Sequence, residues 1–324
     1  MDLKKFLSSH PVIPAPMAGV TDFPFREILI SLGVELVFTE MISSKGLVYG
    51  NSGTEDLLNL NEQGLQGIQL FGAEPDIMGQ AAQIVSQKCQ PDIIDINLGC
   101  PAPKVVKTGA GAALMKTPDK AAEVIEKIIT QSKVPVSVKI RAGWDENNIN
   151  ALKISKSASK LGVAAVTVHG RTRKQFYKGT ADWEIIAQIK HELDIPVIGN
   201  GDVFSPQDAQ KMKQQTGCDA IMVARGMRGN PWLVKNSIKE LENAEWEQPD
   251  YHTKLKMAQT HLNKAVKYYG EKRGVPKMRG HLSWYLKGLP HSNTIKDRIN
   301  EITSKSKVLQ EIQDYENKLD EFFN

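Results

Sequence analysis

The sequence has the length and composition of an ordinary globular protein. It contains 324 residues, of which 41% are hydrophobic and 24% are charged, and its formal net charge is +4 at pH 7. This length allows two domains, or one large barrel with an appendage. No apolar run approaches the length of a membrane span, and the first residues lack the apolar core of a signal peptide. We therefore expect a cytoplasmic protein that has no membrane partner.

The cysteines and histidines exclude two further classes of protein. The three cysteines are Cys89, Cys100 and Cys218. An odd and sparse set of this kind argues against a disulfide framework and for a reducing cytosol. The histidines are scattered, and neither a CxxC nor an HExxH spacing occurs. We therefore expect no metal site.

Eight short apolar runs follow one another along the first part of the chain. Each run is continuously apolar, which is typical of strands in a parallel sheet that is buried on both faces. The runs are Val12–Pro16, Leu36–Thr39, Gly67–Phe71, Ile93–Leu98, Val134–Ile140, Ala164–His169, Ile195–Gly199 and Ala220–Ala224.

Amphipathic segments alternate with these runs and predict helices. Examples are Asp76–Gln87, Pro118–Ser132, Ile149–Leu161 and Trp183–Glu192. Segment Ser205–Thr216 begins with Ser-Pro, an N-cap followed by proline at the first helical position. Eight such βα units in roughly 245 residues predict an α/β fold, the (β/α)8 TIM barrel.

The character of the sequence changes after about Asn243. Residues 247–250 have the composition of a linker, and the chain beyond them is rich in Lys, Glu, Leu, Gln and Tyr without any strand-like run. We predict a barrel domain over residues 1–245 and a small all-helical C-terminal domain over residues 246–324.

Polar residues gather where the apolar runs end. The C-terminal ends of the strands form the rim at which barrel enzymes carry out their chemistry, so this pattern favours an enzyme. The rim residues include Met17, Gln69, Asn97, Cys100, Lys139, Arg141, His169, Asn200, Asp202 and Arg225.

Cys100 stands just past a strand, between Gly99 and Pro101, which places it on a loop over the barrel mouth. A thiol near its reference pKa of roughly 8.5 is mostly protonated at neutral pH, so it can donate a proton. The alternative is a structural cysteine, because free cysteines are often buried. Cys89 and Cys218 lie in or beside ordinary helical patterns, and we expect them to be structural.

Lys139 ends an apolar strand and needs an anionic or electron-rich partner, because a bare buried ammonium is costly. It is a candidate for a Schiff-base nucleophile, a phosphate ligand or a cation beside a reduced flavin ring.

Residues 200–202 and 224–226 end the last two runs, at the usual phosphate site of a TIM barrel. Residues 169–174, with one histidine and three cations, fit a phosphate, a flavin or a solvated basic loop.

The glycine-rich segment Gly109–Leu114 superficially resembles a dinucleotide-binding turn. No convincing strand precedes it, and no acidic residue follows at the distance that would place it on a ribose. We predict instead a flexible loop over the active site.

The predicted C-terminal domain begins with a strongly basic stretch. Nine Lys and Arg residues lie between Tyr251 and Lys287, against one acid, and an acidic tail follows. Residues 268–287 also interleave these cations with aromatics, a combination that suits RNA phosphates and bases. Lys277 and Arg279 are therefore expected RNA contacts. The alternative is a helix whose aromatics are core and whose cations form a solvated face.

Nine segments together carry a family resemblance. They are APMAGVTDFPFR (15–26), TEMISS (39–44), QLFG (69–72), DINLGCPAPKV (95–105), VKIRAGW (138–144), VHGRTR (168–173), IPVIGNGD (195–202), ARGMRGNPW (224–232) and RGHLSWYL (279–286). In this order they resemble the tRNA-dihydrouridine synthase family, and most closely its bacterial B-type branch.

This resemblance implies an FMN-binding barrel, a helical tRNA-binding domain and NADPH or NADH as the diffusible reductant. It implies no obligatory protein partner. Cys100 would be the proton donor, and Gln69 and Lys139 would hydrogen-bond the flavin ring. The remaining implied cofactor residues are Pro16, Met17, Ala18, His169, Asn200, Gly201, Asp202, Ala224 and Arg225. The implied substrate RNA contacts on the barrel are Asn97, Arg141, Arg171 and Arg173.

The chain departs from the family at Ala224, where the family usually has glycine. The extra methyl group adds bulk beside the expected phosphate. Three alternatives remain from the residues: a barrel of the dihydroorotate-dehydrogenase type that acts on a free small molecule, an RNA-binding protein without activity, and an aldolase that uses Lys139 as a Schiff base.

Overall fold

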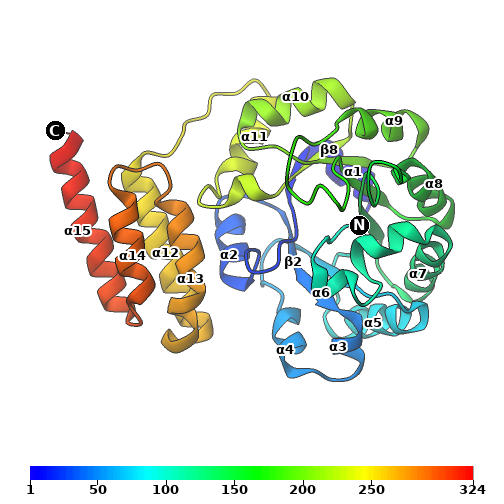
Figure 1. Cartoon of the computed structure of the whole chain (residues 1–324), viewed down its shortest axis with the longest axis horizontal. Coiled ribbons are helices and arrows are strands. Elements are labelled where there is room, and N and C mark those ends of the chain that lie inside the picture. The colour runs from blue at the N-terminus through cyan, green and yellow to red at the C-terminus, as the bar shows by residue number, and fades with distance from the viewer. Residues whose placement is uncertain (324) are drawn as a thin grey trace.

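The computed structural model describes residues 1–323, and eight parallel strands stand at its centre (Figure 1). The strands are β1 Val12–Pro14, β2 Leu36–Ser43, β3 Leu65–Phe71, β4 Ile93–Asn97, β5 Val136–Arg141, β6 Ala165–His169, β7 Val197–Asn200 and β8 Ala220–Val223. Hydrogen bonds join them in the order β1-β8-β7-β6-β5-β4-β3-β2, and β1 also contacts β2. The sheet thus curls into the predicted barrel, and all eight predicted strands are confirmed.

Helices surround this barrel (Figure 1). They are α2 Phe23–Ser31, α3 Ser44–Val48, α4 Ser52–Glu55, α5 Pro75–Lys88, α6 Pro103–Val106, α7 Pro118–Gln131, α8 Ala151–Leu161, α9 Glu184–Glu192, α10 Pro206–Thr216 and α11 Leu233–Leu241. Short 3-10 turns are η1 Asp56–Leu58, η2 Gly111–Lys116 and η3 Arg225–Met227. Helix α1, Leu3–Ser9, precedes β1 and buries two leucines against the barrel interior. Helix α10 starts with the predicted cap, because the Ser205 side chain and Asp208 form a capping box.

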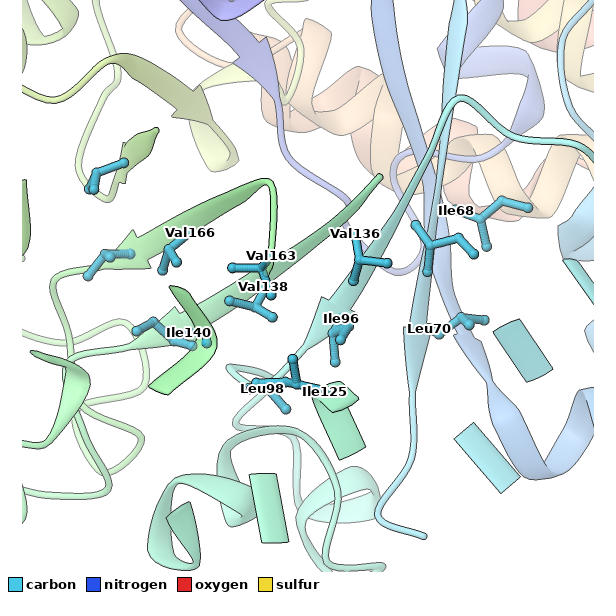
Figure 2. Close-up of a cluster of buried hydrophobic side chains, with 14 of the residues drawn as sticks. Ile68, Leu70, Ile96, Leu98, Ile125, Val136, Val138, Ile140, Val163 and Val166 are labelled. Carbon is cyan, nitrogen blue, oxygen red and sulfur yellow. The ribbon is translucent and has the colours of Figure 1, made fainter. Parts of the chain in front are cut away.

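Side chains of the strands alternate between two apolar environments. Ile96 and Val138 face outward, where Figure 2 shows them in the cluster that also contains Ile125 of α7. Ile93, an odd number of positions from Ile96 on the same strand, faces the barrel interior, as Ile198 of β7 does. Because both faces are buried, apolar residues occur on both faces of the strands rather than on one alternating face.

The barrel interior becomes polar toward the C-terminal ends of the strands. Along β4 the inward residues are Ile93, then Asp95, then Asn97, all of them buried. Strand register places Asp95 beside Ser137 of β5 and Asn97 beside Lys139. The fold therefore gathers polar side chains from different strands at one end of the barrel.

Four helices form a second unit beside the barrel (Figure 1). They are α12 Tyr251–Tyr269, α13 Glu271–Tyr285, α14 Ser292–Glu301 and α15 Lys305–Phe323. They enclose an apolar core of their own, with Leu262, Met278 and Ile312 near its centre. The predicted domain boundary at residues 245 and 246 falls in the segment between α11 and α12. None of the helices in residues 1–323 combines the length and the apolarity that a membrane span requires.

The helical unit packs against the start of the barrel. The rings of Phe23 and Tyr268 stack with their centroids 4.4 Å apart. The Tyr269 hydroxyl donates to Oδ2 of Asp22 at 3.1 Å. An added Cβ at Gly229, after β8, would overlap the backbone of Trp284 on α13. These contacts hold α12 and α13 beside the loops that follow β1 and β8.

The prediction of a flexible loop over residues 109–114 was wrong. Ala110 is buried, and the following residues form the 3-10 turn η2 with Gly111, Ala112 and Leu114 also buried. The amide of Ala112 donates to the carbonyl of Cys100 at 3.0 Å. Residues 110–114 therefore pack against the Cys100 loop and support it.

Candidate active site

A cavity of about 310 Å³ opens at the C-terminal ends of the strands. Its volume falls at the lower end of the range of small-molecule sites, roughly 300–1,000 Å³. Its lining includes every residue that the resemblance assigns to the cofactor, together with Cys100, Asn97 and Arg141. The other lining residues are Ala15, Met41, Gly99, Pro101, Ala102, Phe176, Tyr177, Val203, Phe204, Met222, Gly226 and Arg228.

Lys139 occupies the inner part of this cavity. Its amine donates to Oδ1 of Asn200 at 2.8 Å, and the amide of Asn200 in turn donates to the carbonyl of Met222 at 2.7 Å. Burial, and then the neighbouring Arg141 guanidinium, lower the pKa of Lys139 to about 8. The ammonium form therefore predominates at neutral pH but is poorly solvated, so it can stabilise negative charge on a bound group.

Arg225 lies at another part of the cavity, with Asp202 beside it. The Arg225 guanidinium lies over the rings of Tyr177 and Phe204, 4.6 and 5.4 Å from their centroids. One of its nitrogens is 3.2 Å from Oδ1 of Asp202. At Gly201, φ is +120° and an added Cβ would come within 2.8 Å of the His169 ring. A glycine is therefore required for the backbone to come this close to the histidine.

His169 adds an unpartnered polar atom to the cavity wall. Its Nε2 is buried and has no hydrogen-bond partner within the described chain. Burial, followed by the cations Lys139 and Arg141, lowers the pKa of this imidazole well below its usual value. The ring is therefore neutral at physiological pH, and a bound ligand would satisfy its free nitrogen.

Side chains of Asn97 and Arg141 hold the backbone of the loop that carries Cys100. Oδ1 of Asn97 accepts from the amides of Gly99 and Cys100 at 3.1 and 2.8 Å. The carbonyl of Gly99 accepts from Nε of Arg141 at 2.8 Å. Burial raises the pKa of the Cys100 thiol, against an opposing hydrogen bond from Ala102 and the nearby cations. The thiol therefore keeps its proton at neutral pH.

Comparison with known proteins identifies the family. The family model described as dihydrouridine synthase matches residues 13–321. The chain belongs to the dihydrouridine synthase family. The "Probable tRNA-dihydrouridine synthase" of Rickettsia conorii is 39% identical to it over 325 residues, covering 98% of both chains. The proteins named "tRNA-dihydrouridine synthase B" from Pasteurella multocida and Shewanella oneidensis are 37% and 38% identical, covering 98% and 88% of this chain and 96% and 89% of theirs.

The expected RNA residues of this dihydrouridine synthase family member differ in their placement. Asn97 and Arg141 line the cavity. Arg171 does not, because its guanidinium is buried and bonded to both carboxylate oxygens of Asp202, at 2.6 and 2.7 Å. It also donates to the carbonyls of Lys178 and Gly179. Arg171 is thus placed to orient Asp202 and the loop at residues 178 and 179.

Arg173 is half-buried, with its guanidinium 4.8 Å from the ring centroid of Trp144. Arg173 is not among the residues that line the cavity. On α13, Lys277 is exposed and lies over the ring of Tyr269 at 4.7 Å. Arg279 is half-buried and bonded to the carbonyl of Ile302 at 3.4 Å. Of these two α13 cations, Lys277 is the one free to meet a partner in solution.

Sequence reasoning missed several residues of the site. The aromatic residues Phe176, Tyr177 and Phe204 form part of the cavity wall, and each comes from an irregular loop that shows no periodicity. Asp95 lies just beneath the cavity, where its side chain accepts from Gln69. An acidic residue in the middle of a buried strand was the one available signal for Asp95, since a buried carboxylate needs partners.

Proposed function

We propose that this protein is a tRNA-dihydrouridine synthase, which uses FMN and NADPH to reduce uridine in tRNA to 5,6-dihydrouridine. One observation carries the proposal: a protonated thiol, Cys100, shares a single cavity with the half-buried cation Lys139 and with groups suited to a phosphate. Membership of the dihydrouridine synthase family, and relatives named for this activity over nearly their whole length, support it.

The residues present fit a flavin mononucleotide. Arg225, with the glycines at 201 and 226, offers a cation and close backbone approach for one phosphate group. The unpartnered Nε2 of His169 needs a ligand. Gln69 and Lys139 would meet the polar edge of the ring, and residues 16–18 would lie against it. A single phosphate site without a dinucleotide-binding turn favours FMN over FAD.

A flavin held by these residues would supply the hydride that C6 of the uracil ring receives, with NADPH as its source. Hydride addition at C6 leaves negative charge on the uracil ring, and Cys100 neutralises this charge by giving its proton to C5. The resulting thiolate regains a proton from solvent, so the net change is the addition of H₂ across the C5–C6 bond. The ammonium group of Lys139 would stabilise negative charge on the polar edge of the flavin ring.

The uracil must leave its stack to enter a cavity of this kind, as in other enzymes that modify bases within RNA. The helical domain, which we place at residues 246–324, would bind the body of the tRNA through its exposed cations. Phosphates suit these cations and make such binding salt-dependent. A tRNA substrate also implies a cytoplasmic location.

The direct test combines the purified protein, FMN, NADPH and an unmodified tRNA transcript without oxygen. We expect one or more uridines to gain the mass of two hydrogens, measured by mass spectrometry of nuclease fragments. Reduction of a free pyrimidine with no reduction of tRNA would instead identify a small-molecule dehydrogenase. A covalent adduct at Lys139 after borohydride trapping with a carbonyl substrate would identify an aldolase.

A further inference from the structure

Asp95 is a buried acid that lies below the cavity and is not part of its lining. Only 1% of its surface is exposed. Both carboxylate oxygens are occupied: Oδ1 accepts from the Ser137 hydroxyl at 2.6 Å and Oδ2 from Nε2 of Gln69 at 2.6 Å. These partners are its register neighbours on β5 and β3. Asp95 therefore stands at the centre of a row that runs across three strands.

Hydrogen bonds continue from this row to the Cys100 loop. Oε1 of Gln69 accepts from Nδ2 of Asn97 at 2.8 Å. Oδ1 of Asn97 then accepts from the amides of Gly99 and Cys100. The side chains of Asp95, Gln69 and Asn97 thus form one unbroken chain of bonds that ends at the backbone of Cys100.

The chain has a direction, and its two ends set it together: the carboxylate of Asp95 at one end and the backbone N–H groups of Gly99 and Cys100 at the other. An ionised carboxylate can only accept, so Gln69 must turn its NH₂ group toward Asp95 and its carbonyl toward Asn97. Asn97 must then turn its own carbonyl toward the loop. If both amides were reversed, the NH₂ of Asn97 would face two backbone N–H groups, and two hydrogen bonds of the Cys100 loop would be lost.

We propose that Asp95 is a positioning residue that fixes the orientation of the Gln69 and Asn97 amides and, through them, the place of the Cys100 thiol at the cavity. The assignment of Cys100 as proton donor rests on the proposed function, but the chain of bonds does not. Asp95 would thereby act on two amides that line the cavity and on the loop that carries the cavity's one thiol.

The cost of burying this group supports a role beyond packing. Burial raises the pKa of Asp95 to about 6, despite the hydrogen bonds from Gln69 and Ser137. An apolar side chain would avoid that cost, as Ile93 does one step lower on the same strand. The carboxylate is still ionised at neutral pH, which is the state that imposes the direction.

The test measures the Cys100 thiol in the full-length protein, with Cys89 and Cys218 changed to alanine so that one cysteine remains. The rate of alkylation by iodoacetamide is followed against pH. Its midpoint reports the thiol pKa, and its plateau at high pH reports how accessible the thiolate is. Asp95→Asn removes the acceptor-only end of the chain and leaves the two loop N–H groups alone to hold the amides, so we expect the plateau to rise at least threefold. Loss of the charge alone would shift the midpoint and leave the plateau unchanged.

The double variant Asp95→Asn with Gln69→Glu is the decisive comparison. It moves the acceptor-only group one step along the chain: Asn at 95 donates to Glu at 69, and Asn97 must again donate to position 69. We expect the plateau to return to within twofold of the parent. Ser137→Ala removes a partner without changing the direction, and it should leave the plateau at the parent value.

Three results would overturn the proposal. In the first, Asp95→Asn is folded by circular dichroism and has the parent plateau. In the second, the double variant is no closer to the parent than the single variant. In the third, the double variant fails to fold while Ser137→Ala folds. The double variant restores the direction of the hydrogen bonds, so the proposal predicts that it folds. Alkylation requires neither tRNA nor reductant, so each of these results is separate from a failure to form dihydrouridine.

Discussion

The cations at the C-terminal end of the barrel are placed differently from the cations of the helical unit. In the barrel, Lys139, Arg141 and Arg171 point inward. Each donates a hydrogen bond to another residue of the protein: Lys139 to Asn200, Arg141 to Gly99 and Arg171 to Asp202. In the helical unit, most of the cations between 251 and 287 lie on the outside, as Lys277 does. An inward cation is fixed in position and acts on one ligand group. An outward cation acts through the field that it adds to a surface. Changes in the two regions should therefore differ in size and in kind.

The largest effect is expected at the barrel, from Cys100→Ala. Loss of a general acid typically slows a step by about 10²–10⁴-fold. Flavin binding and reduction by NADPH should remain, because the thiol is expected to meet the substrate. Anaerobic stopped-flow mixing of the reduced protein with unmodified tRNA measures the step. Cys89→Ala and Cys218→Ala are the matched controls. A wild-type rate for Cys100→Ala would make Cys100 structural.

Arg225→Ala tests the phosphate end of the same cavity. Loss of one charge-assisted hydrogen bond should weaken flavin binding by about 1.5–3 kcal/mol, or about 10- to 150-fold in Kd. Flavin fluorescence during titration of the apoprotein measures this affinity. Arg228→Ala, another arginine of the cavity lining, is the comparison variant. Equal flavin affinity in wild type and Arg225→Ala would move the phosphate away from Arg225.

The pH dependence of tRNA reduction tests Lys139. A pKa of about 8 means that the group is protonated below that pH and neutral above it. The rate should therefore fall as pH rises, by about tenfold between pH 7 and 9, if the ammonium is the active form. Lys139→Arg keeps the charge over this range and should flatten the profile. The same decline in both proteins would assign it to another group, such as the Cys100 thiol.

The smallest effect is expected on the helical unit. Lys277→Glu should weaken tRNA binding a few-fold and reduce the log–log salt slope by about one unit, while NADPH oxidation by the flavin stays unchanged. Fluorescence anisotropy with labelled tRNA at several salt concentrations measures both quantities. Lys307→Glu, at an exposed site on α15, is the control for a general charge effect. Arg279→Glu should also lower thermal stability, because Arg279 bonds to Ile302.

The fold was accessible from sequence because the strands are apolar on both faces, and the rim position of Lys139 or Cys100 follows from where each strand ends. The pairing of side chains was not accessible. Arg171 follows a strand as a rim residue should, but its bond to Asp202 depends on two loops that meet only in the folded barrel. The chain from Asp95 to Cys100 depends in the same way on register between strands.

Residues 109–114 show a second limit. Their glycines and alanines have the composition of a mobile loop, yet four of the six, Ala110, Gly111, Ala112 and Leu114, are buried. At Gly111 an added Cβ would come within 2.8 Å of the Cys100 carbonyl, so the residue is small because space is short. Composition alone does not distinguish a glycine that serves flexibility from one that permits close packing.

The contact at Gly229 has a consequence for the choice of uridine. Barrel and helical unit meet there backbone to backbone, and the Tyr269–Asp22 bond joins them at a second point. These two contacts set the distance between the outward cations and the cavity in this structure. Under the proposed function, this distance would select the uridine. When the helical unit binds the body of the tRNA, the nucleotide that lies at that distance reaches Cys100, whatever the sequence on either side of it.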